Sequence, residues 1–161
     1  MKKIISVVFT SIVLQLAALA QQLPAVKLFD LEGNAINTAQ FNEANKKPVV
    51  LAFWATWCIP CINELSVIND VQEDWRKTVQ FDFFAVAEDD SRTVKRVQPL
   101  VNGKNWDLTV LLDKNQDLKR ALNLMNVPYT IVIKNGKIVY RHAGYVTGDE
   151  VLLLKAIKEN Q

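Results

Sequence analysis

The chain contains two cysteines, Cys58 and Cys61, and both lie in the segment Trp57-Cys58-Ile59-Pro60-Cys61. Two thiols at this spacing can form and break a disulfide within one protein, which is the chemistry of thiol–disulfide exchange. The segment before the pair has the length of a strand and the segment after it has helical periodicity, so Cys58 is predicted at a helix N-terminus. Free N–H groups and the positive end of the helix dipole stabilise a thiolate there. The spacing therefore predicts a nucleophilic Cys58 and a resolving Cys61.

A structural disulfide or a zinc site fits the cysteine pair less well. A structural disulfide usually closes a longer loop, and the chain-entropy formula gives only about 2 kcal/mol for a four-residue ring. A zinc site needs four ligands, whereas the sequence has no third cysteine and a single histidine, His142. His142 falls on a predicted strand and is interpreted as a surface residue. We expect a redox-active pair, with no metal and no cofactor.

The elements around the pair alternate between strands and helices. Val49–Trp54 is a continuous apolar run that predicts a buried strand, and the helix after the cysteines extends to about Trp75. Further strands are predicted over 26–31, 35–36, 81–87, 109–112, 129–134 and 137–143, with helices over 39–44, 92–101, 117–124 and 149–158. This order predicts an α/β fold with early parallel strands and a final antiparallel hairpin at Asn135-Gly136.

An acidic trio, Glu88-Asp89-Asp90, follows the strand predicted over 81–87. Ligands of open α/β sheets gather at the carboxyl ends of the strands, where Cys58 is also predicted. Helix capping explains the trio equally simply, because acidic side chains stabilise helix N-termini. Capping is the interpretation that we favour.

The first twenty residues differ from the rest. Met1-Lys2-Lys3 is basic, residues 4–20 are largely apolar, and Ala18-Leu19-Ala20 has the small-x-small pattern of a cleavage site. We expect a signal peptide over 1–20, or an uncleaved membrane anchor, and one domain over 21–161. Loss of the segment lowers the formal charge from +2 to 0, which argues against nucleic acid as a partner. The domain is expected to be exported and monomeric.

The sequence resembles the thioredoxin superfamily, and within it the exported TlpA/ResA-like thiol-disulfide oxidoreductases. Thr56–Cys61 (TWCIPC) is similar to the active-site signature, and 125–130 (MNVPYT) to the cis-proline segment. The segment 28–33 (LFDLEG) resembles the N-terminal hairpin of this branch. The resemblance covers about 23–158. It implies a thioredoxin fold with an N-terminal β-hairpin and an inserted helix and strand between 91 and 112, around a mixed central sheet flanked by helices.

The resemblance also implies roles for residues away from the cysteines. Pro128 is expected to be cis, an isomer that sequence alone does not give because about one X-Pro bond in twenty adopts it. The backbone of Val127 would then lie beside Cys58 and pair with an extended substrate peptide. Trp57 is expected to border the same groove.

One departure from classical thioredoxin concerns proton transfer. Classical thioredoxin has a buried aspartate in the strand before its motif, and the matching position here is Ala52. The TlpA/ResA-like branch instead resembles CxxCxxE, which Cys61-Ile62-Asn63-Glu64 fits. Glu64 is three residues after Cys61 on the same helix face, where it could take the proton of the resolving thiol. A solvated first-turn glutamate is the alternative.

The sequence therefore predicts an exported thiol-disulfide oxidoreductase that reduces disulfides in exported proteins. The resemblance implies apocytochrome c among the substrates and a membrane thiol carrier as electron donor. Two alternatives stay open. The same residues could serve a thiol oxidase or disulfide isomerase at a higher potential, and a copper chaperone could use the same fold. A peroxiredoxin is disfavoured because the sequence has no PxxxTxxC pattern.

Overall fold

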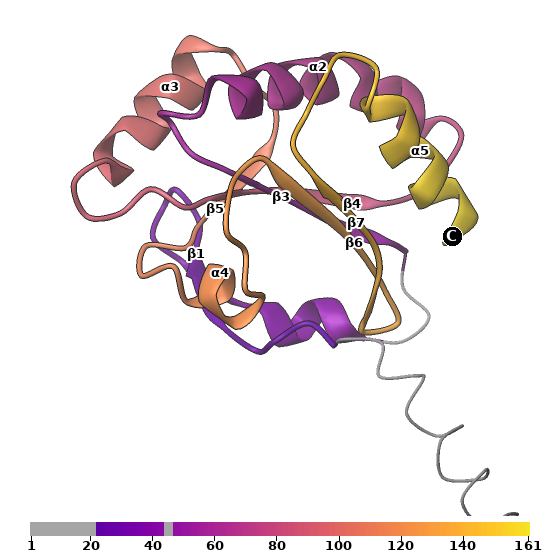
Figure 1. The fold of residues 1–161 in the computed structure, drawn as a ribbon, viewed down its shortest axis with the longest axis horizontal. Coiled ribbons are helices and arrows are strands. Elements are labelled where there is room, and N and C mark those ends of the chain that lie inside the picture. The colour runs from indigo at the N-terminus through magenta and orange to yellow at the C-terminus, as the bar shows by residue number, and fades with distance from the viewer. Residues whose placement is uncertain (1–21, 44–46) are drawn as a thin grey trace, which may run out of the picture.

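Figure 1 shows a computed structural model that describes residues 22–43 and 47–161. The segment predicted as a signal peptide or anchor, 1–20, lies outside the described residues. Seven strands form one sheet in the order β2-β1-β5-β4-β3-β6-β7. Within the described ranges, no helix is both long and apolar enough to cross a membrane.

The strands are β1 (Lys27–Phe29), β2 (Ala35–Asn37), β3 (Val49–Trp54), β4 (Asp82–Ala87), β5 (Thr109–Leu112), β6 (Tyr129–Lys134) and β7 (Lys137–Ala143). The helices are the 3-10 turns η1 (Thr38–Asn42) and η2 (Val94–Arg96) and the α-helices α2 (Ile59–Arg76), α3 (Val97–Gly103), α4 (Asp117–Ala121) and α5 (Glu150–Glu159).

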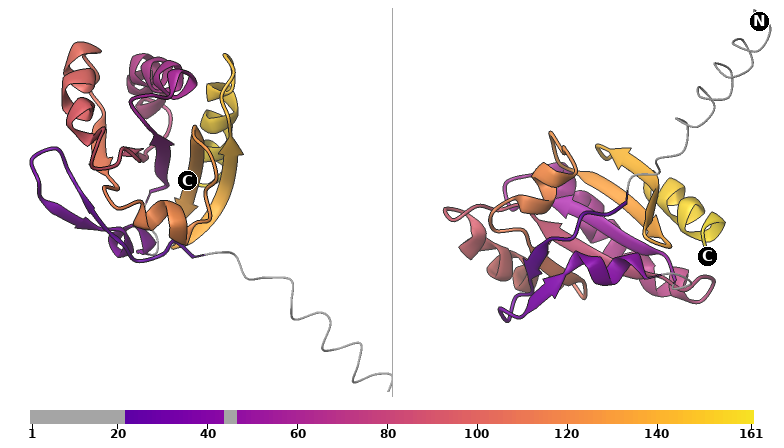
Figure 2. Two further views of the ribbon diagram at one scale, coloured as in Figure 1. Left: turned by 60° about the vertical axis from the view of Figure 1, so that its left-hand side comes forward. Right: turned by 90° about the horizontal axis from the view of Figure 1, so that it is seen from below.

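The sheet is mixed, as predicted. β3 pairs in parallel with β4, and β4 with β5, whereas β6 is antiparallel to both β3 and β7. The helices α2, α3 and α5 cover one face of the sheet, and α4 and η1 cover the other (Figures 1 and 2). Because β3 is covered on both faces, all six of its residues are buried, which explains its continuous apolar sequence.

Alternate residues of β3 supply two hydrophobic cores. Val50, Ala52 and Trp54 face the core under α2, and Val49, Leu51 and Phe53 face the core on the α4 side. The strand is therefore held from both sides. Its carboxyl end, where the chain turns toward the cysteines, is fixed relative to the rest of the sheet.

The active-site helix α2 is close to its predicted extent and ends at Arg76. Cys58 is its N-cap residue, and Pro60 lies in the first turn, where a proline removes no intrahelical hydrogen bond. The buried positions Leu65, Ile68, Gln72 and Trp75 follow helical periodicity. Packing of this stripe on the sheet fixes the helix N-terminus beside the end of β3.

Two predicted helices are shorter than expected. The segment predicted as a helix over 92–101 is a 3-10 turn followed by α3, which begins at Val97. A proline fits only the first helical turn, so Pro99 limits how far α3 extends toward the N-terminus. Similarly, α4 ends at Ala121 rather than at 124, and Asn123 has a φ of 55°, which no right-handed helix accommodates.

The two hairpins are present near their predicted positions. At the N-terminus, β1 pairs with β2 and β1 also reaches β5, although β1 is shorter than the predicted strand over 26–31. The final hairpin has the predicted bounds, and its turn residues Asn135 and Gly136 have φ values of 50° and 73°. Two consecutive positive φ angles are those of a type I′ turn, which the Asn-Gly pair favours.

Candidate active site

Cys58 and Cys61 form a disulfide at the junction of β3 and α2, with their Cα atoms 5.3 Å apart. The Sγ atom of Cys58 accepts the backbone N–H of Cys61 at 3.3 Å. Cys58 is 5 % exposed and Cys61 is fully buried. Of the two sulfurs, that of Cys58 is therefore the more accessible to another protein.

The position of Cys58 favours its thiolate. As the N-cap of α2 it lies at the positive end of the helix dipole, and the N–H of Cys61 already points at its sulfur. A charge-assisted hydrogen bond from this N–H stabilises the anion more than the neutral thiol. The geometry supports Cys58 as the attacking group and Cys61 as the resolving group.

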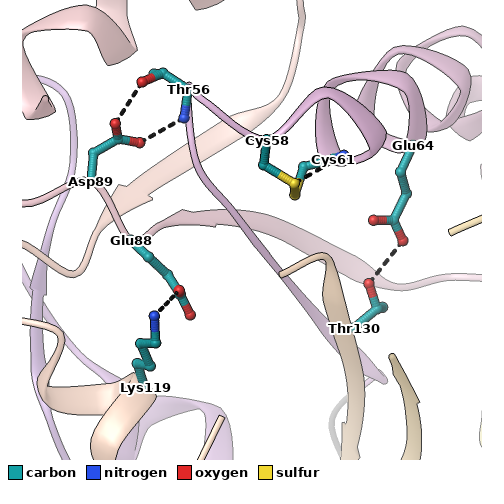
Figure 3. Close-up of a disulfide and its surroundings, with 8 residues drawn as sticks. All are labelled: Thr56, Cys58, Cys61, Glu64, Glu88, Asp89, Lys119 and Thr130. Atoms are coloured by element: carbon teal, nitrogen blue, oxygen red, sulfur yellow. Dashed lines mark hydrogen bonds and ion pairs between the residues drawn. A yellow bond between two sulfur atoms is a disulfide. The ribbon is translucent and has the colours of Figure 1, made fainter. Parts of the chain in front are cut away.

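Glu64 lies one helical turn beyond Cys61 and is only 5 % exposed. Its Oε1 accepts a hydrogen bond from the hydroxyl of Thr130 on β6 at 3.0 Å (Figure 3). Burial raises the pKa of Glu64 to about 7; the bond from Thr130 lowers it in part, and the negative charge of Asp149 raises it. A carboxyl group with this pKa can take and return a proton near neutral pH.

The peptide bond between Val127 and Pro128 is cis, as the resemblance implies. Tyr129 pairs with Phe53, so Pro128 is adjacent to the end of β3, from which the chain continues to Cys58. The carbonyl of Pro128 accepts the N–H of Gly144 at 2.8 Å. Val127 packs against both hydrophobic cores. The structure thus brings this segment to the end of the sheet that carries the cysteines.

Two apolar side chains flank Cys58 and are exposed. Trp57 is 58 % exposed and Ile59 is 72 % exposed. Exposed apolar side chains beside a reactive group are typical of a surface that binds another protein. Trp54, by contrast, is fully buried and packs edge-on against the ring of Trp106.

The acidic trio is where the capping interpretation was wrong for two residues. Asp90 does accept the backbone N–H of Arg92 in the turn before η2. Asp89, however, is buried and accepts both the N–H and the hydroxyl of Thr56, at 2.9 and 2.6 Å (Figure 3). It therefore holds the turn that leads to Cys58.

Glu88 departs from the capping interpretation in a different way. Its Oε2 lies 2.8 Å from Nζ of Lys119 on α4, and its side chain is fully buried. Burial raises the pKa of Glu88, and Lys119 offsets this in part. The rule that ligands gather at the carboxyl ends of parallel strands, the alternative to capping, applies to both acids.

His142 is half-buried rather than a surface residue. Its Nε2 lies 3.1 Å from Oδ2 of Asp149, which also accepts the N–H of Val146. The pair fixes the turn between β7 and α5. Because Asp149 also acts on Glu64, this turn is part of the electrostatic surroundings of the site.

Comparison with known proteins shows the family of the chain. The AhpC/TSA family model matches residues 19–141. The chain belongs to the AhpC/TSA family. The thioredoxin-like protein YneN of Bacillus subtilis is 30% identical over 81% of this chain and 75% of its own. The thiol-disulfide oxidoreductase ResA of Bacillus anthracis is 28% identical over 83% of this chain and 74% of its own.

Solved structures show the same fold. A thioredoxin-like protein from Porphyromonas gingivalis has a TM-score of 0.73 and 40% identity, covering 85% of this chain and 90% of that one. A putative thiol:disulfide interchange protein DsbE from Chlorobium tepidum has a TM-score of 0.74 at 22% identity, covering 88% and 96%. The predicted thioredoxin fold is confirmed.

Within the AhpC/TSA family, this member is a thiol-disulfide oxidoreductase similar to ResA, as the resemblance implies. The roles of Cys58, Cys61, Glu64 and Pro128, and of Trp57 and Val127 in the expected groove, stay predictions that the geometry described above supports.

Proposed function

We propose that this protein is an exported reductant of disulfides in other exported proteins. The observation that carries the proposal is the Cys58–Cys61 disulfide at the N-terminus of α2, with the buried carboxyl group of Glu64 one turn away. In the reduced protein, Cys58 supplies the nucleophile, Cys61 the resolving thiol and Glu64 a proton acceptor with a pKa of about 7.

The reaction proceeds in two exchanges. The Cys58 thiolate attacks one sulfur of the substrate disulfide, and the other substrate sulfur leaves as a thiolate and takes a proton from water. Cys61 then passes its proton to Glu64 and attacks Sγ of Cys58. The second substrate sulfur leaves as a thiolate and takes the proton that Glu64 holds, which returns Glu64 to its carboxylate form. The substrate gains two electrons and two protons, and the protein is left with its own disulfide.

The remaining site residues hold the substrate. Trp57 and the backbone of Val127, beside cis Pro128, flank the cysteine pair and accept an extended peptide by strand pairing and apolar contact. Export follows from the apolar segment 1–20, cleaved or kept as an anchor. The resemblance supports apocytochrome c as one substrate and a membrane thiol carrier as the donor that reduces Cys58–Cys61 again.

The reduction potential of the Cys58–Cys61 pair tests the direction of electron flow. Equilibration of the protein with glutathione buffers, read by alkylation and mass spectrometry, gives this potential. A value of about −270 mV, as in thioredoxin, supports a reductant, whereas a value of about −120 mV assigns the protein to the oxidases. A copper titration of the reduced protein tests the chaperone alternative, which requires tight stoichiometric binding.

A further inference from the structure

Three buried carboxyl side chains lie at the carboxyl ends of β4 and β5, and the fold explains two of them. Both oxygens of Asp89 accept hydrogen bonds from Thr56. The oxygens of Asp113 accept the backbone N–H groups of Asp117 and Lys119, at 2.8 and 3.0 Å, at the start of α4. These two carboxylates satisfy backbone donors that would otherwise lack partners.

Glu88 is the third carboxyl group, and the fold explains only one of its two oxygens. Its Oε2 is paired with Lys119, whose Nζ lies 2.8 Å away. Among the residues that the structure describes, Oε1 has no hydrogen-bond partner although it is buried. An unpaired buried carboxylate oxygen lowers stability, so a donor is expected to reach it in the working protein.

A cavity of about 280 Å³ lies beside Glu88. Its lining is Trp57, Glu88, Asp90, Arg92, Thr93 and Gln116. The hydroxyl oxygen of Thr93 is also buried and, within the described ranges, has no hydrogen-bond partner. Pockets for small-molecule ligands hold roughly 300–1,000 Å³, so this cavity suits one side chain. Since Trp57 precedes Cys58, the side chain would come from a protein bound at the cysteine.

Gln116 lines the cavity together with Glu88. Its side-chain Nε2 donates to the carbonyl of Glu88 at 2.9 Å, and its φ of 55° is in the left-handed region. Non-glycine residues adopt this conformation at a cost and are enriched at functional sites. This hydrogen bond joins the amide to the backbone of Glu88, so a guest that supplies its own donor can replace it.

The charges around the cavity select the guest. Two acids, Glu88 and Asp90, and one base, Arg92, line the cavity. The charges of Asp89 and Asp113 also act on Glu88, whereas Lys119 opposes them, which leaves a negative balance. A cation beside a buried carboxylate is favoured, and the unpaired atoms of Glu88 and Thr93 both accept hydrogen bonds. We propose that this cavity is a subsite for a lysine or arginine side chain next to the substrate cysteine, an inference that rests on the proposed reduction of protein disulfides.

Peptide reduction by the full-length, pre-reduced protein tests the subsite. Each five-residue peptide carries one cysteine as a mixed disulfide with thionitrobenzoate. Each peptide has Lys, Arg, Gln, Met or Glu at a single position, either before or after that cysteine. Release of thionitrobenzoate, followed by absorbance, gives the second-order rate. The ratio of the Lys to the Met peptide within one protein cancels any general loss of activity.

We expect the Lys or Arg peptide to react about five- to tenfold faster than the Met peptide at the best position, the size of one partly buried ion pair. The ratio should fall toward one in Glu88→Gln. Thr93→Val, which keeps the shape and leaves the Glu88–Lys119 pair intact, should lower the ratio less. Glu73→Gln, an exposed acid on α2 that does not line the cavity, should keep the wild-type ratio.

The outcomes separate the two proposals. Peptides that are reduced with no preference for a basic side chain, or with a preference that survives both Glu88→Gln and Thr93→Val, would overturn the subsite alone. A larger rate for the Gln than for the Lys peptide would overturn the choice of a cation. No reduction of any peptide would overturn both the subsite and the proposed function.

Discussion

At the scale of single residues, two buried glutamate side chains lie on opposite sides of the disulfide (Figure 3). Glu64 accepts a hydrogen bond from Thr130, and Glu88 is paired with Lys119. Both have a raised pKa because burial disfavours the charged carboxylate. They differ in position, since Glu64 is on the helix that carries Cys61, whereas Glu88 follows β4 and lines a cavity together with Trp57.

The proton-transfer role of Glu64 predicts a change in the pH dependence of exchange. Glu64→Gln should slow the reduction of a substrate disulfide by about tenfold or more, because the resolving thiol loses its proton acceptor. The wild-type rate should rise as the pH passes through about 7, the pKa of Glu64, and this step should be missing in the variant. Stopped-flow rates from pH 5 to 9 measure both, and superimposable profiles would remove Glu64 from the mechanism.

The raised pKa of Glu64 also predicts a change in stability with pH. Between the ordinary value of 4.5 and about 7, the folded protein holds a proton that the unfolded chain has released. The free energy of unfolding should therefore fall as the pH rises through this window, by about 3 kcal/mol from this group alone.

Urea unfolding at pH 4.5 and pH 8 measures the effect. The oxidised protein is used because both cysteines are then in the disulfide and do not titrate. Glu64→Gln should lack this part of the pH dependence, so the difference between wild type and variant isolates the group. An equal loss of stability in both proteins would show that Glu64 is not held protonated by the fold.

At the scale of elements, the final hairpin shows how one turn sets the position of a strand that faces the site. Gly136 has a φ of 73°, and a Cβ atom there would lie 3.0 Å from the backbone oxygen of Asn42. The turn fixes the pairing of β6 and β7, which places Thr130 opposite His142. Thr130 is the residue that donates to Glu64, so the turn also supports the site.

Gly136→Ala should destabilise the protein by about 1–2 kcal/mol, because an L side chain is disfavoured in the left-handed region. Gly103→Ala is the matched control: no atom lies within 4 Å of the added Cβ, and its φ is not positive. Thermal unfolding of both variants measures the difference. Equal melting temperatures would mean that the hairpin turn relaxes without cost.

The elements also show what sequence patterns can and cannot predict. The run Val49–Trp54 is sufficient to predict β3, and the pair Asn135-Gly136 is sufficient to predict the final hairpin. A buried strand and a type I′ turn both depend on local composition. The ends of α3 and α4 were missed because 3-10 turns and isolated left-handed residues depend on local contacts, such as the bond of Asp90 to Arg92. Element type was therefore predictable, whereas the lengths of α3 and α4 were not.

In the candidate site, too, some contacts can be predicted from sequence and others cannot. Cys58, Cys61 and Glu64 lie within seven residues of one helix, so their proximity follows from helical spacing. Asp89 and Thr56 are 33 residues apart, and Thr130 and Glu64 are 66 apart. These contacts depend on which strands are neighbours in the sheet, and no pattern within a single element carries that information.

At the scale of the whole molecule, the described residues before β1 belong to the folded domain. Leu23 is 2 % exposed and packs in the core on the α4 side. The hydroxyl of Thr38 donates to the carbonyl of Pro24 at 2.5 Å and accepts the N–H of Val26 at 2.8 Å. A boundary after residue 20 would leave these contacts intact, and it stays a prediction.

Two truncations test this boundary. A chain that begins at residue 21 should unfold in one transition with the melting temperature of the full chain. A chain that begins at residue 27 should lose about 3 kcal/mol, the sum of burying one leucine side chain and forming two hydrogen bonds. Equal stability of the two truncated chains would show that 21–26 is dispensable to the domain.

The central claim is that Cys58 attacks the substrate and Cys61 resolves the mixed disulfide. Incubation of Cys58→Ser and Cys61→Ser with a disulfide-bonded protein, followed by intact mass spectrometry under non-reducing conditions, tests it directly. The account predicts that Cys61→Ser accumulates a covalent adduct through Cys58, because nothing in that variant can release it, and that Cys58→Ser accumulates none. An adduct on Cys58→Ser and none on Cys61→Ser would contradict the account.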